Sequence, residues 1–458
     1  MFITVPNRFF VSDKFCGSGA FGWNSVHPFS KILRAPTNGR RSSSFKASLI
    51  SNPDAFEVGK FIGSYGYMNV TSYSSVQSGG PSSVGLFVDL DAGYSSEDVE
   101  QLKVQDVGEG QVKIRLYEGR VALGPLRGAR VIFKVYPGNR AGGAEADMMA
   151  ANELNAHAYL QSDRKSICPN IQILLGGFET KTGEQVYKIF QINKCETFGL
   201  HCKLYLNVET LVQWLAFRND GKYSAADYAK ASSETLTRDP AQGENKFWNP
   251  FDLDQTFKRR HLFIIKLLHG AMNGLAYMHE RGRLHQSIGP ASVVLNTIVE
   301  RDAAYLVPRL RDLAFSVDTC NSPLEAVPGA FSEGLWRRAT AAGAFTTAEK
   351  KAFGIADDIY EAGLLFAYLA FVPFCEAGVM DALSLQRLFE STFKLDLVAA
   401  REYCEADDRL SEAVRFLDLG GGGGWELLQA MLNPDFRQRP VTQTVLMHRF
   451  LTDKTIGG

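Results

Sequence analysis

Residues 275–296 constrain the fold of this chain more tightly than any other stretch, because a helix, a polar loop and a strand follow one another there without a spacer. The apolar helix is expected to end at His279, and a short polar turn separates it from His285. Pro290 then leads into an apolar strand at residues 293–295. Any fold of the chain must therefore hold a short polar loop between a helix end and a strand.

Composition narrows the class of protein. At 458 residues the chain is several times longer than a single core of about 150 residues, so we expect a bilobal domain with extensions, or two to three domains. A net charge of −1 gives no global electrostatic reason for binding nucleic acid or an anionic membrane. The seven cysteines include no C-x-x-C pair, and their odd number argues against a disulfide framework and a structural zinc site.

The first 46 residues differ from the rest of the chain in charge. They are rich in serine and hold a single acid, Asp13, a composition typical of organellar transit peptides. We predict a plastid transit peptide over residues 1–46 and a location in the chloroplast stroma, because serine content outweighs any regular amphipathic Arg helix. A mitochondrial presequence and a disordered basic tail are the alternatives. The basic residues of this segment are Arg8, Lys14, Lys31, Arg34, Arg40, Arg41 and Lys46.

The apolar run at residues 362–374 is similar in composition to a membrane segment. Its length of about 13 residues is too short for the roughly 20 residues that span a bilayer. We therefore predict a buried helix at this position, and no membrane span.

Lys134 is flanked on both sides by strand-forming apolar residues, in the run VIFKVY at residues 131–136. An isolated ammonium group in a protein core is costly. The lysine must therefore either reach the rim of the core or be paired with another group. A surface lysine on an edge strand is the alternative.

The loop at residues 275–296 resembles the catalytic loop of eukaryotic protein kinases, in which a helix ending in Y-L-H is followed by H-R-D-x-K-P-x-N and a short strand. The order of helix, loop and strand matches the family, but the residues that carry the chemistry differ. His285 is expected to be a packing and hydrogen-bonding residue. The resemblance places the family's His, Arg, catalytic Asp, Lys and metal-binding Asn at His285, Gln286, Ser287, Gly289 and Ser292, respectively.

The run at residues 131–134 resembles the family's V-A-I-K motif. The resemblance implies that Lys134 binds the α and β phosphates of ATP and pairs with a glutamate on a helix. Glu153, in the predicted helix 148–160, is the candidate for that glutamate. Glu145 is the second candidate. We rank it below Glu153 because it lies close to a pair of glycines.

Gly108 and Gly110 are the candidate glycine loop, since glycine lets a backbone approach a phosphate and the alternating residues that follow predict a strand. The family's third glycine falls at Lys113. The pattern at residues 62–66 also resembles a glycine loop, but it lies far upstream. We expect that segment to be an extension packed on the N-terminal lobe.

Residues 311–315, RDLAF, resemble the kinase D-F-G motif and imply a magnesium ligand at Asp312, with Ser292 in the position of the second metal ligand. Asp358 lies in a segment that resembles the family's D-x-W-S-x-G, which implies that it holds the backbone of the catalytic loop. Arg439 matches the arginine of the last family signature, but no A-P-E glutamate is found to pair with it.

The resemblance covers residues 102–451 and predicts an α+β fold, a bilobal kinase-like domain with a small β-rich N-terminal lobe and a larger helical C-terminal lobe. We place an N-terminal extension at residues 47–100, the N-terminal lobe at 101–195, and the C-terminal lobe at 196–453 with a polar insertion at about 218–256. Periodicity predicts strands at 171–178 and 184–189 that turn at 181–183, and helices at 204–217 and 257–279.

Taken together, the motifs imply a pseudokinase that binds ATP, with a regulatory or scaffolding role toward an unidentified protein partner. Lys134, Glu153 and Asp312 imply a lysine clamp and a Mg²⁺ ligand, as phosphoryl transfer requires. Ser287 cannot accept a proton as a carboxylate does, and general-base catalysis is worth about 10² to 10⁴ in rate. The alternatives are an active serine/threonine kinase of unusual mechanism, a protein of this fold that transfers another group from ATP, and a scaffold that binds no nucleotide.

Overall fold

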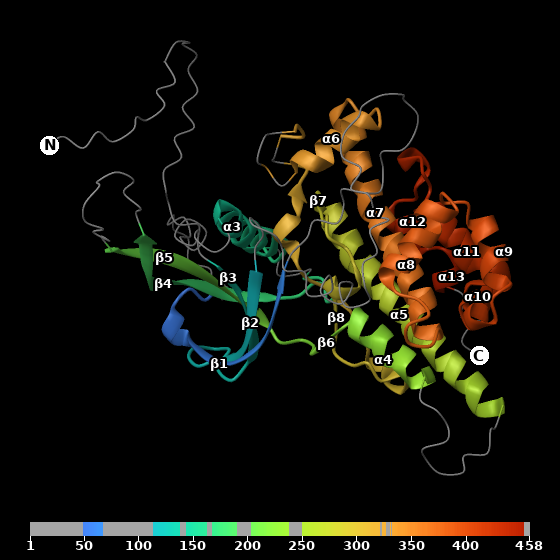
Figure 1. The fold of residues 1–458 in the computed structure, drawn as a ribbon, viewed down its shortest axis with the longest axis horizontal. Coiled ribbons are helices and arrows are strands. Elements are labelled where there is room, and N and C mark those ends of the chain that lie inside the picture. Colours follow the sequence, from blue (N-terminus) through green and yellow to red (C-terminus); the bar gives the residue numbers. More distant parts are fainter. Residues whose placement is uncertain are drawn as a thin grey trace, which may run out of the picture. The chain divides into compact units, whose positions relative to one another are not determined.

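The computed structural model describes residues 49–66, 113–137, 143–162, 167–189, 203–237, 250–320, 323–326, 330 and 332–452, all of which belong to one compact unit. A β-rich part is followed along the chain by a helical part (Figure 1). This confirms the predicted α+β class with a small β-rich lobe and a larger helical lobe. The predicted transit peptide, Gly108 and Gly110 lie outside the described residues.

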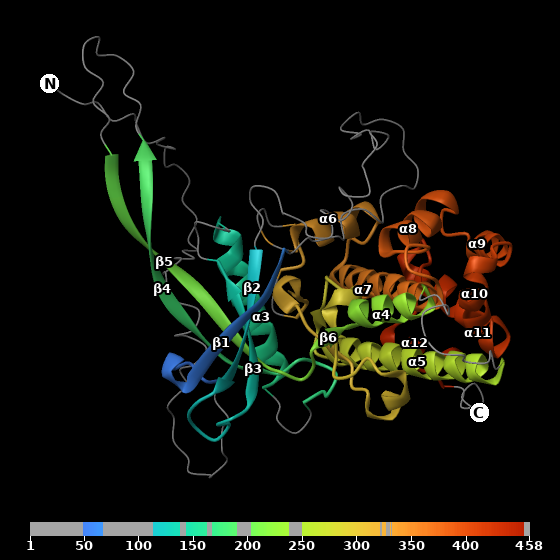
Figure 2. The ribbon, with the colours of Figure 1, turned by 60° about the horizontal axis from the view of Figure 1, so that its bottom comes forward.

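The β-rich lobe is an antiparallel sheet of β1 (Phe56–Gly66), β2 (Lys113–Val121), β3 (Arg130–Tyr136), β4 (Leu174–Ile189) and β5 (Lys203–Arg218). Their order in space is β1-β2-β3-β5-β4. The helix α3 (Gly143–Leu160) packs against β3, β4 and β5. Figure 2 shows β4 and β5 continuing side by side beyond the other strands.

β3 is buried on both faces, and this determines where its lysine lies. Phe133 packs edge-on against Phe56 of β1, with 5.5 Å between the ring centroids, and it is fully buried. Because side chains alternate along a strand, Lys134 and Tyr136 lie on the opposite face, where α3 covers the sheet. The lysine therefore points into the interior between the strand and the helix.

Two predictions within the sheet were wrong. Residues 204–217 form β5, a central strand between β3 and β4, and not a helix. Residues 211–217 (LVQWLAF) are mostly apolar, and periodicity alone cannot separate such a run from a buried helix. Residues 181–183 form no turn, because β4 continues through them while pairing with β5, with Gly183 opposite Glu209.

The sheet also begins earlier than predicted. β1 lies inside the segment that we assigned to an N-terminal extension, and it is an edge strand whose last residue, Gly66, pairs with Lys113 of β2. Residues 57–62 are exposed. The strand therefore lacks the alternation of buried and exposed residues that marks a strand in a sequence.

The helical lobe confirms one predicted helix, extends it, and corrects the polar insertion. The predicted helix at 257–279 lies within α5 (Pro250–Glu280). The supposed insertion contains β6 (Tyr223–Ser224) and α4 (Ala225–Thr237). The small and polar residues of α4 concealed its helical pattern in the sequence. Its buried face includes Tyr228, which stacks on Phe263 of α5 with 4.3 Å between the ring centroids.

The apolar run at 362–374 is buried, as predicted, within α7 (Thr347–Phe371) and the 3₁₀ turn that follows it. In the part of the chain that the structure describes, no helix is both long and apolar enough to cross a membrane. The remaining helices are α6 (Glu333–Ala341), α8 (Ala382–Gln386), α9 (Leu397–Glu405), α10 (Ser411–Leu417), α11 (Leu419–Met431), α12 (Thr442–Leu446) and α13 (Arg449–Thr452).

Candidate active site

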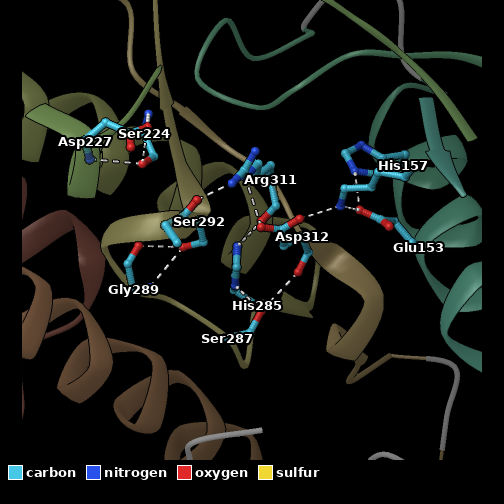
Figure 3. A network of polar contacts seen from close by, with 12 residues as sticks. Glu153, His157, Ser224, Asp227, His285, Ser287, Gly289, Ser292, Arg311 and Asp312 are labelled. Atoms are coloured by element: carbon cyan, nitrogen blue, oxygen red, sulfur yellow. Dashed lines mark hydrogen bonds and ion pairs between the residues drawn. The ribbon is translucent and has the colours of Figure 1, made fainter. Parts of the chain in front are cut away.

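The ammonium group of Lys134 lies between two carboxylates in the interior of the protein. Its Nζ is 2.6 Å from Oε1 of Glu153 on α3 and also contacts Oδ1 of Asp312, which follows β9 (Arg309–Leu310). Only 2% of the lysine is exposed to solvent. The structure thus pairs Lys134 with Glu153, the first of the two predicted glutamates, and brings Asp312 from the helical lobe to the same nitrogen. Figure 3 shows Glu153 and Asp312 close to each other.

Two further residues complete the surroundings of Glu153. The Tyr136 hydroxyl donates a hydrogen bond to Glu153 Oε2, and His157 Nε2 lies 3.9 Å from Oε1. Burial, reinforced by the nearby Lys134 charge, lowers the pKa of His157 to about 3, so the imidazole is neutral at physiological pH. Both residues could have been found from spacing: Tyr136 shares a strand face with Lys134, and His157 follows Glu153 by one helical turn.

Asp312 is held in an unusual backbone conformation. Its φ of 68° and ψ of 53° place it in the left-handed region, which non-glycine residues seldom occupy. Its Oδ2 lies 3.1 Å from Nε of the preceding residue, Arg311, while Oδ1 faces Lys134. Two cations therefore bind this carboxylate. The sequence analysis did not identify Arg311 as a site residue.

Asp358 of α7 anchors the catalytic-type loop. Its carboxylate accepts hydrogen bonds from the backbone N–H groups of His285 and Gln286 at 2.8 and 2.9 Å, the role that the resemblance implied. Burial by itself raises the pKa of Asp358, but the hydrogen bond and charge of His279 outweigh it and leave the pKa below its ordinary value. The loop is thus fixed to the helical lobe by an ionised acid.

His285 and Ser287 both face the segment that carries Asp312. His285 Nε2 lies 3.1 Å from the Arg311 carbonyl oxygen, and the Ser287 hydroxyl donates to the Asp312 carbonyl oxygen at 3.0 Å. Burial lowers the pKa of His285, which favours the neutral imidazole. The serine at the position of the catalytic aspartate therefore joins two loops and presents no carboxylate.

Ser292 is poorly placed to bind a metal. Its hydroxyl donates to the Gly289 carbonyl oxygen and accepts from the Gly289 N–H, both at 2.9 Å, so it closes a local turn. Asp312 is already bound by Lys134 and Arg311. Among the described residues, no cluster of three or more His, Cys, Asp or Glu side chains forms a metal site. Asp312 and Ser292 as they stand do not fit the magnesium site that the motifs predicted.

The chain is similar in sequence to a known protein kinase. No protein-family model matches the chain. It is 23% identical over 269 residues to the chloroplastic serine/threonine-protein kinase STN7 of Arabidopsis thaliana. This match covers 52% of the chain, and it spans only 43% of the length of that kinase. Among solved structures, an Stt7 homologue from Micromonas algae, soaked with ATP, covers 91% of this chain and 96% of its own at 16% identity, with a TM-score of 0.47.

The site and the sequence match both show a similarity to protein kinases. Lys134 on β3 pairs with Glu153 on α3, the only helix described between β3 and β4. Asp358 of α7 holds the loop that bears His285. The sequence match to a protein kinase covers about half of the chain. The chain is thus similar to a protein kinase in sequence over about half of its length, and its β-rich and helical lobes hold the lysine–glutamate pair and the anchored loop that its motifs predicted.

Proposed function

We propose that this protein binds ATP at Lys134 and transfers phosphate slowly or not at all, and that it acts as a regulator or scaffold. One observation carries the proposal: the Lys134–Glu153 pair is intact at 2.6 Å, while Ser287, at the position of the catalytic base, donates its hydroxyl to the Asp312 carbonyl. The groups that bind a nucleotide are thus kept, and the group that activates a substrate hydroxyl is replaced.

Electrostatics favour an anionic ligand at Lys134. In the family, a lysine paired with a helix glutamate binds the nucleotide's phosphates. Here Glu153 can keep its contact on one side of the ammonium while a phosphate takes the place of Asp312 on the other. Gly108 and Gly110, beyond the described residues, are the proposed backbone contacts to the phosphates.

A second candidate function is an active serine/threonine kinase of unusual mechanism, and one carboxyl group favours it. Glu361 of α7 accepts a hydrogen bond from the Ile288 N–H at 2.9 Å, one residue beyond Ser287. Burial, together with the charges of Asp357 and Asp358, raises the pKa of Glu361 well above its ordinary value, so this carboxyl group holds a proton readily and would act as a base only in its ionised form. Phosphate transfer that Glu361→Gln abolishes would establish this function in place of the first.

We also propose a location in the chloroplast. The relative matched by sequence is a chloroplastic kinase, and residues 1–46 have the composition of a plastid transit peptide. Import of the radiolabelled chain into isolated chloroplasts, with loss of the N-terminal segment, is the expected outcome. A chain that stays outside and protease-sensitive would contradict it.

Thermal unfolding of the full chain with and without ATP tests the nucleotide site. Ligand at about 100 times its dissociation constant adds roughly 2.7 kcal/mol to the folded state. We expect wild type to show the rise and Lys134→Met to lose it, each measured against its own unliganded midpoint. Arg260→Met is the matched control, because it breaks another buried ion pair, to Glu300 at 2.8 Å, away from this site.

Two outcomes would contradict the proposal in different ways. No rise at millimolar ATP would favour a scaffold without a nucleotide site. Vigorous phosphorylation of a protein substrate from radiolabelled ATP, abolished by Lys134→Met, would show an active kinase.

A further inference from the structure

We propose that the Arg311 guanidinium stands in for a magnesium ion at this site, so that the protein binds ATP without a divalent metal. The inference rests on the nucleotide binding proposed above and names the counterion of that same site. It starts from the Asp312 carboxylate, whose Oδ2 lies 3.1 Å from Arg311 Nε and whose Oδ1 contacts Lys134.

Arg311 is fixed in place by the catalytic-type loop. Its backbone N–H donates to the Ser292 carbonyl oxygen at 2.9 Å, and its side-chain Nε donates to the Ala291 carbonyl oxygen at 3.0 Å. The side chain keeps 23% of its surface exposed, whereas that of Asp312 keeps 6%. The guanidinium therefore lies at the solvent side of the carboxylate, held by the turn where the family binds its second metal.

A magnesium ion would lack ligands in this arrangement. Magnesium takes an octahedral set of oxygen atoms, typically one or two carboxylates with phosphates and waters. The Ser292 hydroxyl is engaged with Gly289 in both directions, which leaves Asp312 as the remaining predicted ligand. A divalent cation on Asp312 Oδ2 would meet the positive charge of Arg311 at short range. Repulsion between the two cations works against metal binding.

Before a nucleotide binds, the charges of the four side chains cancel. Lys134 and Arg311 carry two positive charges, and Glu153 and Asp312 carry two negative ones. When a phosphate replaces Asp312 on Lys134, Asp312 keeps Arg311 as its counterion. A guanidinium is permanently charged and has five N–H donors in a planar fork that suits carboxylate and phosphate. Arg311 can therefore bridge Asp312 and the phosphate, the task that a metal performs elsewhere in the family.

Calorimetric titration of the full chain with ATP tests this, first in EDTA and then in excess magnesium chloride. We expect binding in EDTA, with a dissociation constant that magnesium changes by less than about twofold. Arg311→Met removes the charge and keeps much of the volume. We expect it to weaken binding in EDTA by tenfold or more and to make binding depend on magnesium, because Asp312 then has an oxygen for the metal.

Arg309→Met is the matched control, since Arg309 lies two residues away on β9 and pairs with Asp220 at 3.5 Å, outside the site. It should leave both titrations unchanged. Arg311→Lys keeps the positive charge but has fewer N–H donors, and it should still bind ATP without a metal. This variant gives a second test if Arg311→Met does not fold.

The outcomes separate this inference from the proposed function. Binding by wild type only when magnesium is present would overturn the role of Arg311 while leaving nucleotide binding intact. Equal metal-free binding by wild type and Arg311→Met would show that Arg311 merely ties two loops together. Absence of binding under both conditions would remove the proposed function itself.

Discussion

Replacing Asp358 with alanine should cost more stability than any single surface change. The Asp358 carboxylate is fully buried and accepts the backbone N–H groups of His285 and Gln286 at 2.8 and 2.9 Å. In Asp358→Ala both donors lose their partner inside the protein. A buried donor left unpaired costs about 1–3 kcal/mol, so we expect the free energy of unfolding to fall by about 2–6 kcal/mol. Typical domains have about 5–15 kcal/mol in total.

Urea unfolding of the full chain, followed by circular dichroism, measures this loss. Asp358→Asn keeps an acceptor oxygen and should lose less than alanine. Glu412→Ala is the control, because Glu412 is an exposed acid whose surface pair with Arg415, at 3.6 Å, adds little stability, so its midpoint should stay close to that of wild type. Hydrogen exchange at His285 and Gln286 should accelerate only in the Asp358 variants. A loss below about 1 kcal/mol with unchanged exchange would refute the idea that this carboxylate holds the loop.

Three further outcomes follow from the described contacts. Gly119→Val should lower the melting temperature, because a β-carbon there would lie 2.4 Å from the Glu57 carbonyl oxygen and the Phe133 ring, and overpacking costs about 1–3 kcal/mol; an unchanged melting temperature would contradict this. The pKa of Asp358 is lowered in the folded state, so its contribution is present above its unfolded value of about 4 and is lost as pH falls through the folded pKa. Acid unfolding of Asp358→Asn should therefore depend less steeply on pH below about 4 than that of wild type, and equal slopes would contradict the assignment. Asp312→Asn keeps both cations and removes a negative charge beside the phosphate, so calorimetry in EDTA should show equal or tighter ATP binding, and weaker binding would count against the arrangement of charges.

The parts of the site that could be predicted were those that depend on local pattern. Lys134 had to find a partner because its neighbours in sequence are apolar, and Glu153 lies on a helix that faces the same strand. Asp358 was recognised because residues 357–363 resemble the family's D-x-W-S-x-G motif. Each of these inferences needed only the residues around one motif and the order of the motifs.

Other contacts depend on tertiary placement, which local pattern does not reveal. The contact between Arg311 and Asp312 occurs where Asp312 has a left-handed backbone, a conformation that the sequence of a non-glycine residue does not predict. Arg439, for which no A-P-E glutamate was found, donates instead to the carbonyl oxygens of Asn433 and Ala356 at 2.7 and 3.1 Å. Carbonyl acceptors are present at every residue, so a sequence cannot single them out.

The fold shows the same division. α5 and α7 were predicted because one apolar face or a continuous apolar run is long enough to exclude a strand. β5 was taken for a helix because residues 211–217 are mostly apolar, and β1 was missed because its residues 57–62 are exposed. In both strands the decisive information is the neighbouring strand, which lies far away in the sequence.

The burial of the Lys134 ammonium has a consequence for the speed of ligand binding. With 2% of the lysine exposed and its ammonium group in contact with Asp312, a phosphate can take the place of Asp312 only after the two side chains have separated. For the nucleotide binding proposed above, the open state is a minor population, and the apparent dissociation constant exceeds the intrinsic one by the inverse of that population. The association rate would then level off as ATP rises, at the frequency with which Lys134 and Asp312 part.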